Sequence, residues 1–441
     1  MGAIAAELTE LTQILDRDRL CHWEDLPPQK RRQILAAVTP EVQPELMVSP
    51  QTPAELGEVM ALAHRNRWRV LPTGEGSKLH WGGLAEGANL VVSTQRLNRV
   101  IDYPVEEYTL TVEAGMKFAE IQNLLAQNNQ FLAIDPAYAH QATIGGIMAT
   151  GDGGSWRHRY NSVRDQLLGI SFCRHDGELV KAGGRVVKNV AGYDLMKLLT
   201  GSYGTLGIAT QMTFRVYPIP EASATLVLTG TGNAIASAAQ TILSSALTPT
   251  AIDLLSTGFA AGLGVRDAMG LMVRFQSLPE SVTEQSDRVV EVAKKLELQH
   301  QTFRDDAETD LWQRSRILME SGDRETQITG KMGVIPTEAV AILTLLDKIL
   351  PDNAIAIVHA GCGLGRVQIN SKDGQFYLDR ISRLRSTLEE ENGFLSVLEA
   401  PISVKPKLDL WGYSGNAIGI MKTIKQKFDP QNILNPDRFL V

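Results

Sequence analysis

A glycine-rich block between residues 183 and 216 constrains the fold more than any other part of the chain. It reads GGRVVKNVAGYDLMKLLTGSYGTLGIATQMTFRV, and its apolar runs are interrupted by Gly183, Gly184, Gly192, Gly201, Gly204 and Gly207. A glycine in regular structure costs about 0.5–1 kcal/mol relative to alanine, so this repeated use indicates bends, close backbone approaches or a bound ligand. An alternating strand at 211–216 follows. The block predicts glycine-rich backbone laid against a sheet, which can seat a flat cofactor.

Composition limits the class of protein. The 441 residues are 44% hydrophobic and 21% charged, enough for two or three domains with cores of their own. A net charge of −7, without a basic stripe interleaved with aromatic residues, excludes a general nucleic-acid binder. Cys21, Cys173 and Cys362 lie far apart and form no CxxC pair, so we interpret them as structural thiols in a reducing compartment. The chain alone cannot supply the four thiolates of an iron–sulfur cluster.

The first twenty residues do not read as a signal peptide, because acidic residues break every apolar run and no basic segment comes first. No run of 18 apolar residues predicts a transmembrane helix. We therefore expect a soluble, cytoplasmic protein, and peripheral attachment to the inner face of a membrane through a partner stays open.

Four segments are predicted: a charged, helical N-terminal leader at 1–45, an α+β domain at 46–218, a second domain at 219–400 and a C-terminal segment at 401–441 that packs on the first domain. In the first domain, Thr52-Pro53 is typical of a helix start, and His175-Asp176-Gly177 is typical of a hairpin between two strands. In the second domain, the order strand-helix-strand-strand-helix occurs twice. This order favours two ferredoxin-like halves that share one antiparallel sheet.

Three glycine-bearing motifs could hold a cofactor. Residues 72–78, PTGEGSK, follow a strand, and their spaced glycines let successive N–H groups form an anion nest. The segment lacks the spacing of a Walker A loop or a Rossmann fingerprint, and a solvated turn is an equally good interpretation of it alone. The second motif combines Asp135-Pro136 with ATIGG at 142–146 and GDGG at 151–154, and the opening block is the third.

In this order, and with FDPQNILNPDRF near the end, the motifs resemble the FAD-binding oxidoreductases of the vanillyl-alcohol oxidase/PCMH type. The chain is most similar to the glycolate oxidase flavoproteins, in particular the E subunit. The resemblance covers 46–218 and 400–441, and the middle only by architecture. It implies an α+β fold with a two-part PCMH-type FAD-binding domain, an antiparallel cap domain and a short C-terminal return. The implied FAD-binding residues are Pro72, Thr73, Gly74, Glu75, Gly76, Ser77, Lys78, Asp135, Pro136, Thr143, Gly145, Gly146, Gly151, Asp152, Ser155, Gly207, Ile208 and Asn435.

Departures from the family pattern matter as much. Some members attach FAD through a histidine in the glycine turn, where this chain has Gly76 and Ser77 and only His80 nearby, so we expect noncovalent FAD. Catalytic relatives carry His-x-Gly-Asp-Gly-x-x-His in the second domain. The matching stretch here starts at His359 and has Cys362 and Arg366 in place of the aspartate and the second histidine. A lone histidine makes a poor divalent-metal site, so no metal is expected.

Three residues are candidates for catalysis. Arg366 could bind a substrate carboxylate in bidentate fashion, or be a surface arginine. His359 could act at a strand end, and Lys188 could stabilise negative charge near the flavin or simply pair with Asp194.

The resemblance implies an FAD-binding subunit of a glycolate oxidase/dehydrogenase complex. It would oxidise a 2-hydroxy acid such as glycolate or D-lactate and pass electrons to an iron–sulfur subunit, beside a paired flavoprotein subunit. Two alternatives stay open: a non-catalytic flavin-binding structural or electron-relay subunit, and a freestanding FAD-linked oxidase of another hydroxy acid.

Overall fold

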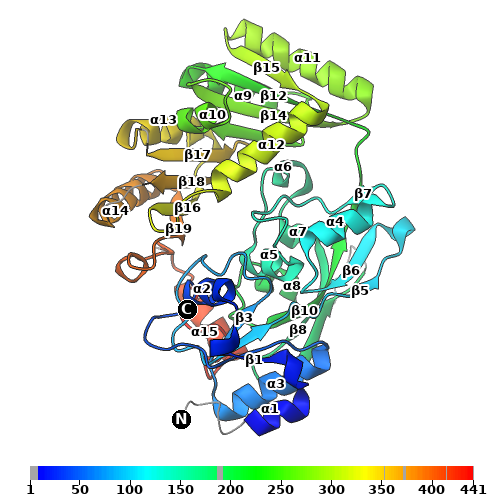
Figure 1. The fold of residues 1–441 in the computed structure, drawn as a ribbon. Coiled ribbons are helices and arrows are strands. Elements are labelled where there is room, and N and C mark those ends of the chain that lie inside the picture. The colour runs from blue at the N-terminus through cyan, green and yellow to red at the C-terminus, as the bar shows by residue number, and fades with distance from the viewer. Residues whose placement is uncertain (1–7, 186–191, 352, 371–373, 414, 441) are drawn as a thin grey trace. The chain divides into compact units, whose positions relative to one another are not determined.

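The computed structural model describes residues 8–185, 192–351, 353–370, 374–413 and 415–440 (Figure 1). The chain forms two compact units. Unit 1 comprises Met1–Gly154, Ser162–Ile219 and Ser414–Val441, and unit 2 comprises Ser155–Asn161 and Pro220–Tyr413. No helix among the described residues is both long enough and apolar enough to cross a bilayer.

Unit 1 contains a small, mostly parallel sheet with the strand order β1 (Leu20–His22), β2 (Leu46–Val48), β4 (Leu90–Ser93), β3 (Val70–Thr73). Both β2 and β3 run parallel to β4, and β1 runs antiparallel to β2. Helix α3 (Pro53–Asn66) packs on this sheet through a core that also holds Leu11 and Leu15 of the N-terminal segment. The predicted helix start is confirmed, because the Thr52 hydroxyl accepts a hydrogen bond from Glu55 N at 3.2 Å.

The second sheet of unit 1 is antiparallel and carries the glycine-rich block. Its strand order is β5 (Val100–Asp102), β6 (Thr109–Glu113), β10 (Ile208–Arg215), β8 (Leu167–Cys173), β9 (Leu179–Gly183). A pair of short strands, β7 (Gln130–Phe131) and β11 (Tyr217–Pro218), lies outside it. The block thus begins at the end of β9, contains α8 (Leu195–Leu199) and continues into the central strand β10. The hairpin predicted at His175-Asp176-Gly177 joins β8 to β9.

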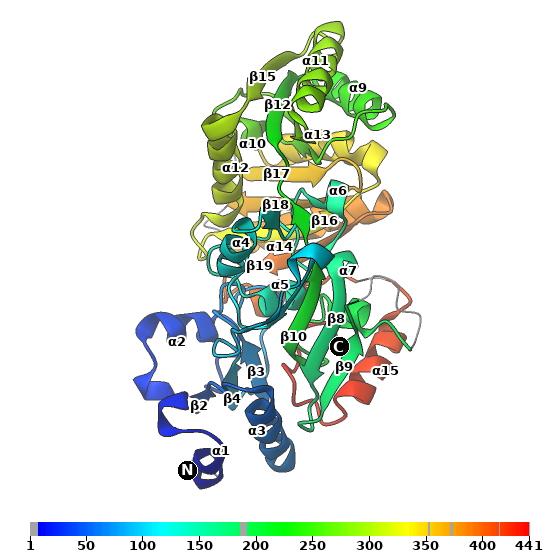
Figure 2. The same cartoon turned by 90° about the vertical axis from the view of Figure 1, so that its right-hand side faces the viewer.

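Apart from α3 and α15, the helices of unit 1 are short. Helix α15 (Ile418–Phe428) is the red helix in Figure 2. Its Ile424 and Phe428 are partly buried and pack against the core cluster of the antiparallel sheet. The helices are α1 (Leu8–Ile14), α2 (Pro28–Leu35), α4 (Phe118–Ala126), α5 (Ile144–Thr150), α7 (Val163–Gln166), α8 (Leu195–Leu199) and α15 (Ile418–Phe428), with single 3-10 turns at Arg17–Arg19, Trp23–Asp25 and Val105–Glu107.

Unit 2 is built on one eight-stranded antiparallel sheet. Its order is β15-β12-β14-β13-β17-β18-β16-β19, which is two ferredoxin-like halves joined where β13 pairs with β17. The strands are β12 (Ala222–Gly230), β13 (Ala251–Leu255), β14 (Met269–Ser277), β15 (Gln299–Phe303), β16 (Gln327–Gly333), β17 (Ala354–His359), β18 (Leu364–Asn370) and β19 (Phe394–Glu399).

Helices cover both faces of the sheet of unit 2. One core cluster joins α9 (Gly232–Leu243), α11 (Pro279–Lys295), α13 (Ala339–Ile349) and α14 (Gly374–Glu390) to one face. A smaller cluster joins α10 (Thr257–Gly262) and α12 (Asp305–Glu320) to the other face. The unit also holds α6 (Arg157–Tyr160) and 3-10 turns at Pro336–Glu338 and Lys405–Lys407.

The predicted α+β class and the paired ferredoxin-like halves are confirmed. Three details differ from the prediction. The leader is not wholly helical: β1 pairs with β2 and so satisfies the backbone groups of that strand's outer edge. The predicted order strand-helix-strand-strand-helix also omits the edge strand β15 after α11, whose largely exposed sequence QHQTF gives no apolar alternation. Residues 401–413 group with unit 2, so the part of the C-terminal segment that joins unit 1 begins at Ser414.

Candidate functional site

The loop at residues 73–78 leaves the end of β3 and is held by buried polar contacts. Lys78 Nζ lies 2.6 Å from the carboxylate of Asp152, and both side chains are almost fully buried. Glu75 pairs with Lys117 at 3.2 Å. Gly74 has to be glycine, because a Cβ there would lie 2.2 Å from Thr143 Oγ1. The loop is therefore a fixed structure and not a solvated turn.

The segment at 143–146 forms the neighbouring wall. Thr143 caps α5, its hydroxyl accepting a hydrogen bond from Gly146 N at 3.3 Å. A Cβ on Gly145 would lie 2.8 Å from the carbonyl oxygen of Ala114. The absence of a side chain at Gly145 thus lets α5 lie close to the backbone that follows strand β6.

The C-terminal return closes the same region. Asn435 adopts a left-handed conformation with φ 49°, and its Nδ2 donates a hydrogen bond of 2.6 Å to Tyr203 O. Its side-chain oxygen Oδ1 is buried and has no partner among the described residues. A buried amide oxygen facing a cavity is a ready acceptor for a ligand donor.

Arg438 lies beside this return and is completely enclosed. Its guanidinium donates hydrogen bonds to the carbonyl oxygens of Ala37 and Gly83, at 3.1 and 2.6 Å, and also to that of Leu79. Burial lowers the pKa of Arg438 to about 10, which still leaves it charged at neutral pH.

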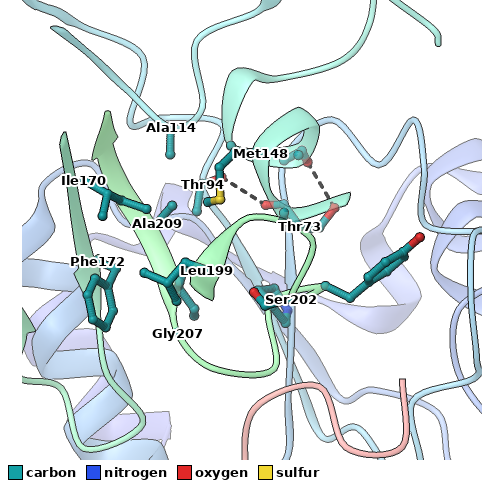
Figure 3. Close-up of a pocket in the computed structure, with 18 residues that line it drawn as sticks. Thr73, Thr94, Ala114, Met148, Ile170, Phe172, Leu199, Ser202, Gly207 and Ala209 are labelled. Carbon is teal, nitrogen blue, oxygen red and sulfur yellow. Dashed lines mark hydrogen bonds between the residues drawn. The ribbon is translucent and has the colours of Figure 1, made fainter. Parts of the chain in front are cut away.

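These elements enclose two adjoining cavities of about 90 and 80 Å³. The first is mainly apolar: Ile170, Phe172, Leu199 and Ala209 gather on one side, with Thr73 and Ser202 opposite (Figure 3). The second, the more polar cavity, is lined by the 72–79 loop, Thr143, Asn435 and Arg438. Pro72, Thr73, Gly74, Gly146, Ala149 and Tyr203 line both.

This arrangement fits FAD. A flat apolar ring suits the first cavity. In the second, the loop and the buried guanidinium suit a phosphate, and the amide oxygen of Asn435 suits a hydroxyl donor of the ribityl or ribose chain. Noncovalent binding also fits, because the loop carries Gly76 and Ser77, while His80 is buried with its Nε2 3.2 Å from the hydroxyl of Tyr138.

The predicted cofactor residues fall into two groups. The structure brings to the two cavities Pro72, Thr73, Gly74, Glu75, Gly76, Ser77, Lys78, Thr143, Gly145, Gly146, Gly207, Ile208 and Asn435. Asp135, Pro136, Gly151, Asp152 and Ser155 are outside the residues that line them. Asp135 instead accepts a hydrogen bond from Gly154 N at 2.9 Å, and Asp152 accepts one from Ala137 N at 2.8 Å. Both carboxylates therefore stabilise backbone of the 135–154 segment and do not line the cavities.

Lys188, predicted to act near the flavin, lies outside the described residues. The alternative partner considered for it, Asp194, caps α8 and pairs with Lys197 at 2.9 Å.

A second polar cluster lies in unit 2, on the sheet face opposite the larger core. His359 Nδ1 is 2.6 Å from the carboxylate oxygen Oδ1 of Asp253, which is fully buried. The two residues are direct partners in the β13–β17 ladder. Because the carboxylate engages Nδ1, the ring nitrogen Nε2 is the one that can accept a proton. Asp253 Oδ2 is buried without a hydrogen-bond partner among the described residues.

His158, on α6, completes this cluster. Its ring occupies the space beside Gly361, where a Cβ would lie 2.4 Å from His158 Nδ1. Burial lowers the pKa of His158; the nearby Asp253 carboxylate opposes this, and His359 and Arg159 reinforce it. The lowered pKa favours the neutral form of the His158 ring.

The predicted Arg366 belongs to the same sheet face. It is half-buried on β18, paired in register with Ile357 of β17 and with Lys331 of β16. Since Ile357 and His359 are two residues apart on one strand, their side chains share a face with Arg366 and Lys331. Cys362 is exposed in the turn between β17 and β18. No group of three or more histidine, cysteine or acidic side chains suited to a metal ion occurs in the described part of the chain.

Sequence reasoning missed Asp253, His158 and Arg438. Arg438 stands in the polar segment NPDRF, where it looks like an ordinary surface cation, so the local sequence does not indicate its burial. Nothing in the local sequence marks Asp253, since AIDLL reads as an ordinary strand.

Comparison with known proteins agrees with this geometry. Residues 44–183 match the FAD binding domain model, and residues 411–439 match the C-terminal domain of FAD linked oxidases. The chain is 26% identical to the glycolate oxidase subunit GlcD of Bacillus subtilis, over 91% of this chain and 90% of that protein. It is 24% identical to a D-lactate dehydrogenase of Anaerostipes hadrus (91% and 90% covered) and 25% identical to a D-2-hydroxyglutarate dehydrogenase of Xanthomonas citri pv. viticola (90% and 89% covered).

Solved structures share the fold. p-Cresol methylhydroxylase with bound substrate superposes with a TM-score of 0.76 at 15% identity, covering 99% of this chain and 96% of the other. The 4-ethylphenol oxidase of Gulosibacter chungangensis gives 0.77 at 14% identity, covering 99% and 97%. The particular likeness to a glycolate oxidase E subunit stays a prediction.

Proposed function

We infer that this chain, an FAD-dependent oxidoreductase with the fold of the PCMH-type flavoenzymes, oxidises the CH–OH group of a 2-hydroxy acid. The observation that carries the inference is the paired cavity of unit 1, apolar at one end and bounded at the other by the 72–79 loop, Asn435 and Arg438. Similarity over nine-tenths of the chain to the glycolate oxidase subunit and to the D-lactate and D-2-hydroxyglutarate dehydrogenases supports the substrate class.

In the proposed reaction, bound FAD supplies the acceptor for two electrons from the substrate carbon. The protein has to bind the carboxylate, orient the C–H bond and take the hydroxyl proton. Arg366 offers a planar guanidinium for the carboxylate, and Lys331 lies next to it in the ladder. His359 accepts the proton at Nε2, and Asp253 stabilises the imidazolium that results.

We further propose that the chain works as a subunit of a glycolate oxidase/dehydrogenase complex, beside a paired flavoprotein and an iron–sulfur protein. The two electrons must leave the chain, and its described cysteines are three separate free thiols. The electrons therefore have to pass to an acceptor outside this chain, and an iron–sulfur protein is one class of acceptor that would serve. Such a partner could also hold the chain at the inner face of a membrane.

The test is an anaerobic visible spectrum of the purified, FAD-loaded chain mixed with glycolate, D-lactate or D-2-hydroxyglutarate. We expect one of these acids to bleach the flavin absorbance, and the Arg366→Gln variant to need a much higher concentration of it. A chain that binds no FAD refutes the flavin role, and bound FAD that no 2-hydroxy acid reduces refutes the catalytic one.

One observation favours a second candidate, a structural or electron-relay subunit. Cys362 and Arg366 stand where the catalytic relatives' motif has an aspartate and a histidine. In that case the isolated chain would keep oxidised FAD in the presence of every acid and be reduced only when the paired flavoprotein is added. Rapid oxygen consumption without any partner would instead favour a freestanding oxidase.

A further inference from the structure

The N-terminal segment reaches the cofactor loop from outside. Helix α2 (Pro28–Leu35) precedes the region that matches the FAD binding domain, which starts at residue 44. Lys30 on this helix donates hydrogen bonds to the carbonyl oxygens of Glu75 at 3.2 Å and Gly74 at 3.5 Å. On the same helix, Gln33 stands 3.1 Å from the position that a Cβ on Gly76 would take. The helix therefore covers the carbonyl side of the loop.

The charges around the polar cavity do not cancel. Lys78 is paired with Asp152, and Lys117 is paired with Glu75. The other two cations, Lys30 and Arg438, donate hydrogen bonds to backbone carbonyl oxygens. Among these described groups, four cations face two carboxylates, a surplus of two positive charges. A pyrophosphate carries one negative charge on each phosphate, so the surplus matches that ligand.

We propose that Lys30 is a cofactor-positioning residue, whose ammonium fixes the carbonyl side of the 73–78 loop and supplies positive charge to the FAD pyrophosphate on its amide side. Binding carbonyls from behind turns the N–H groups of the loop toward the ligand, and a partly buried charge is weakly screened by salt. Burial lowers the pKa of Lys30, opposed by Glu75, which reflects how far the ammonium is withdrawn from water. The proposal rests on FAD binding by this loop.

The experiment separates the two parts of FAD. Full-length chain freed of FAD is titrated calorimetrically with FAD, with ADP, which has the pyrophosphate without the flavin ring, and with riboflavin, which has the ring without phosphate. For Lys30→Gln we expect the Kd for FAD and for ADP to rise roughly tenfold, and the Kd for riboflavin to stay within about twofold.

The matched control is Arg32→Gln, an equal change of charge at an exposed position of the same helix. It should leave all three Kd values within about twofold of the wild-type values, and Lys30→Arg should recover most of the affinity for ADP. Equal weakening of riboflavin and ADP by Lys30→Gln would reveal a merely structural role and overturn the proposal, as would an unchanged Kd for ADP. Wild-type chain that bound no FAD would instead contradict the flavin assignment itself.

Discussion

The C-terminal return depends on one buried ion pair, and Asp429→Asn tests it. Asp429 accepts hydrogen bonds from Ile433 N at 3.0 Å, from Leu434 N at 2.7 Å and from Lys425 Nζ at 2.6 Å. Lys425 also donates to Leu434 O at 3.0 Å and to Thr205 O at 3.0 Å in the glycine-rich block. The pair thus fixes the turn immediately before Asn435, which lines the polar cavity.

The expected loss of stability follows from the burial of the two side chains. The Asp429 side chain has no exposed surface and that of Lys425 is 9% exposed, so the Asp429→Asn substitution would leave an uncompensated ammonium in the interior. Breaking a buried pair in this way costs about 3–5 kcal/mol. An asparagine also has to turn its NH₂ group toward one of three donors. For a domain of the size of unit 1, each kcal/mol corresponds to roughly 2–4 °C in Tm, so we expect a decrease of about 6–20 °C.

Urea unfolding of FAD-free protein, followed by circular dichroism, measures the free energy of unfolding directly. Asp18→Asn is the matched control, because Asp18 pairs with Arg96 at 3.0 Å in the same unit but its side chain is 63% exposed; we expect it to cost below about 1 kcal/mol. The double variant Lys425→Met/Asp429→Asn should be more stable than Asp429→Asn alone, since it removes the unpaired charge. An Asp429→Asn variant within about 1 kcal/mol of wild type would refute this reasoning.

The remaining predictions concern unit 2 and the thiols. Asp253→Asn should slow the reduction of the flavin by substrate about 100-fold or more, with little change in FAD affinity, because His359 would lose the group that stabilises its protonated form. Stopped-flow absorbance measures this rate, and an unchanged rate would contradict the prediction. Burial lowers the pKa of His158 below its ordinary 6.5, so the unfolded chain binds a proton at His158 more readily than the folded chain does. The free energy of unfolding should therefore fall as the pH drops below about 6.5. Urea titrations at two pH values should show a smaller loss for His158→Gln. A thiol reagent at pH 7 should label the exposed Cys362 in the native protein. Burial raises the pKa of Cys173 to about 12 and should protect this thiol until the chain unfolds. Peptide mapping identifies the labelled residues, and labelling of Cys173 in the native protein would contradict the prediction.

The cofactor end of the molecule was largely predictable from sequence because its constraints are local. A glycine at position 74 is required by the Thr143 side chain, and both residues belong to short motifs with recognisable spacing. The order of the strands in unit 2 was equally accessible, since the alternation of strand and helix patterns repeats along the chain. The local sequence pattern did not predict the edge strands β1 and β15. Each forms because the neighbouring strand needs hydrogen-bond partners for its backbone, and the residues of β1 and β15 do not show that need.

Charge balance around the cofactor was not predictable, because its members come from the whole length of the chain. Lys30 and Arg438 act on the same loop from opposite ends of the sequence. Each is an ordinary cation in its own context, one in the run KRR and the other in PDRF. Only the fold reveals that both are directed at backbone carbonyls.

The polar cluster of unit 2 lies where its two ferredoxin-like halves meet, and each half contributes one residue of the Asp253–His359 pair. Strands β13 and β17 are the second strands of their respective ferredoxin-like halves, and they are the pair that joins the halves into one sheet. Asp253 and His359 meet across that seam in direct register, 106 residues apart in sequence. A one-residue slip of the seam would send the two side chains to opposite faces of the sheet. The hydrophobic alternation that fixes the register, with Ile252 and Leu254 in the larger core, therefore also determines that the carboxylate reaches the imidazole.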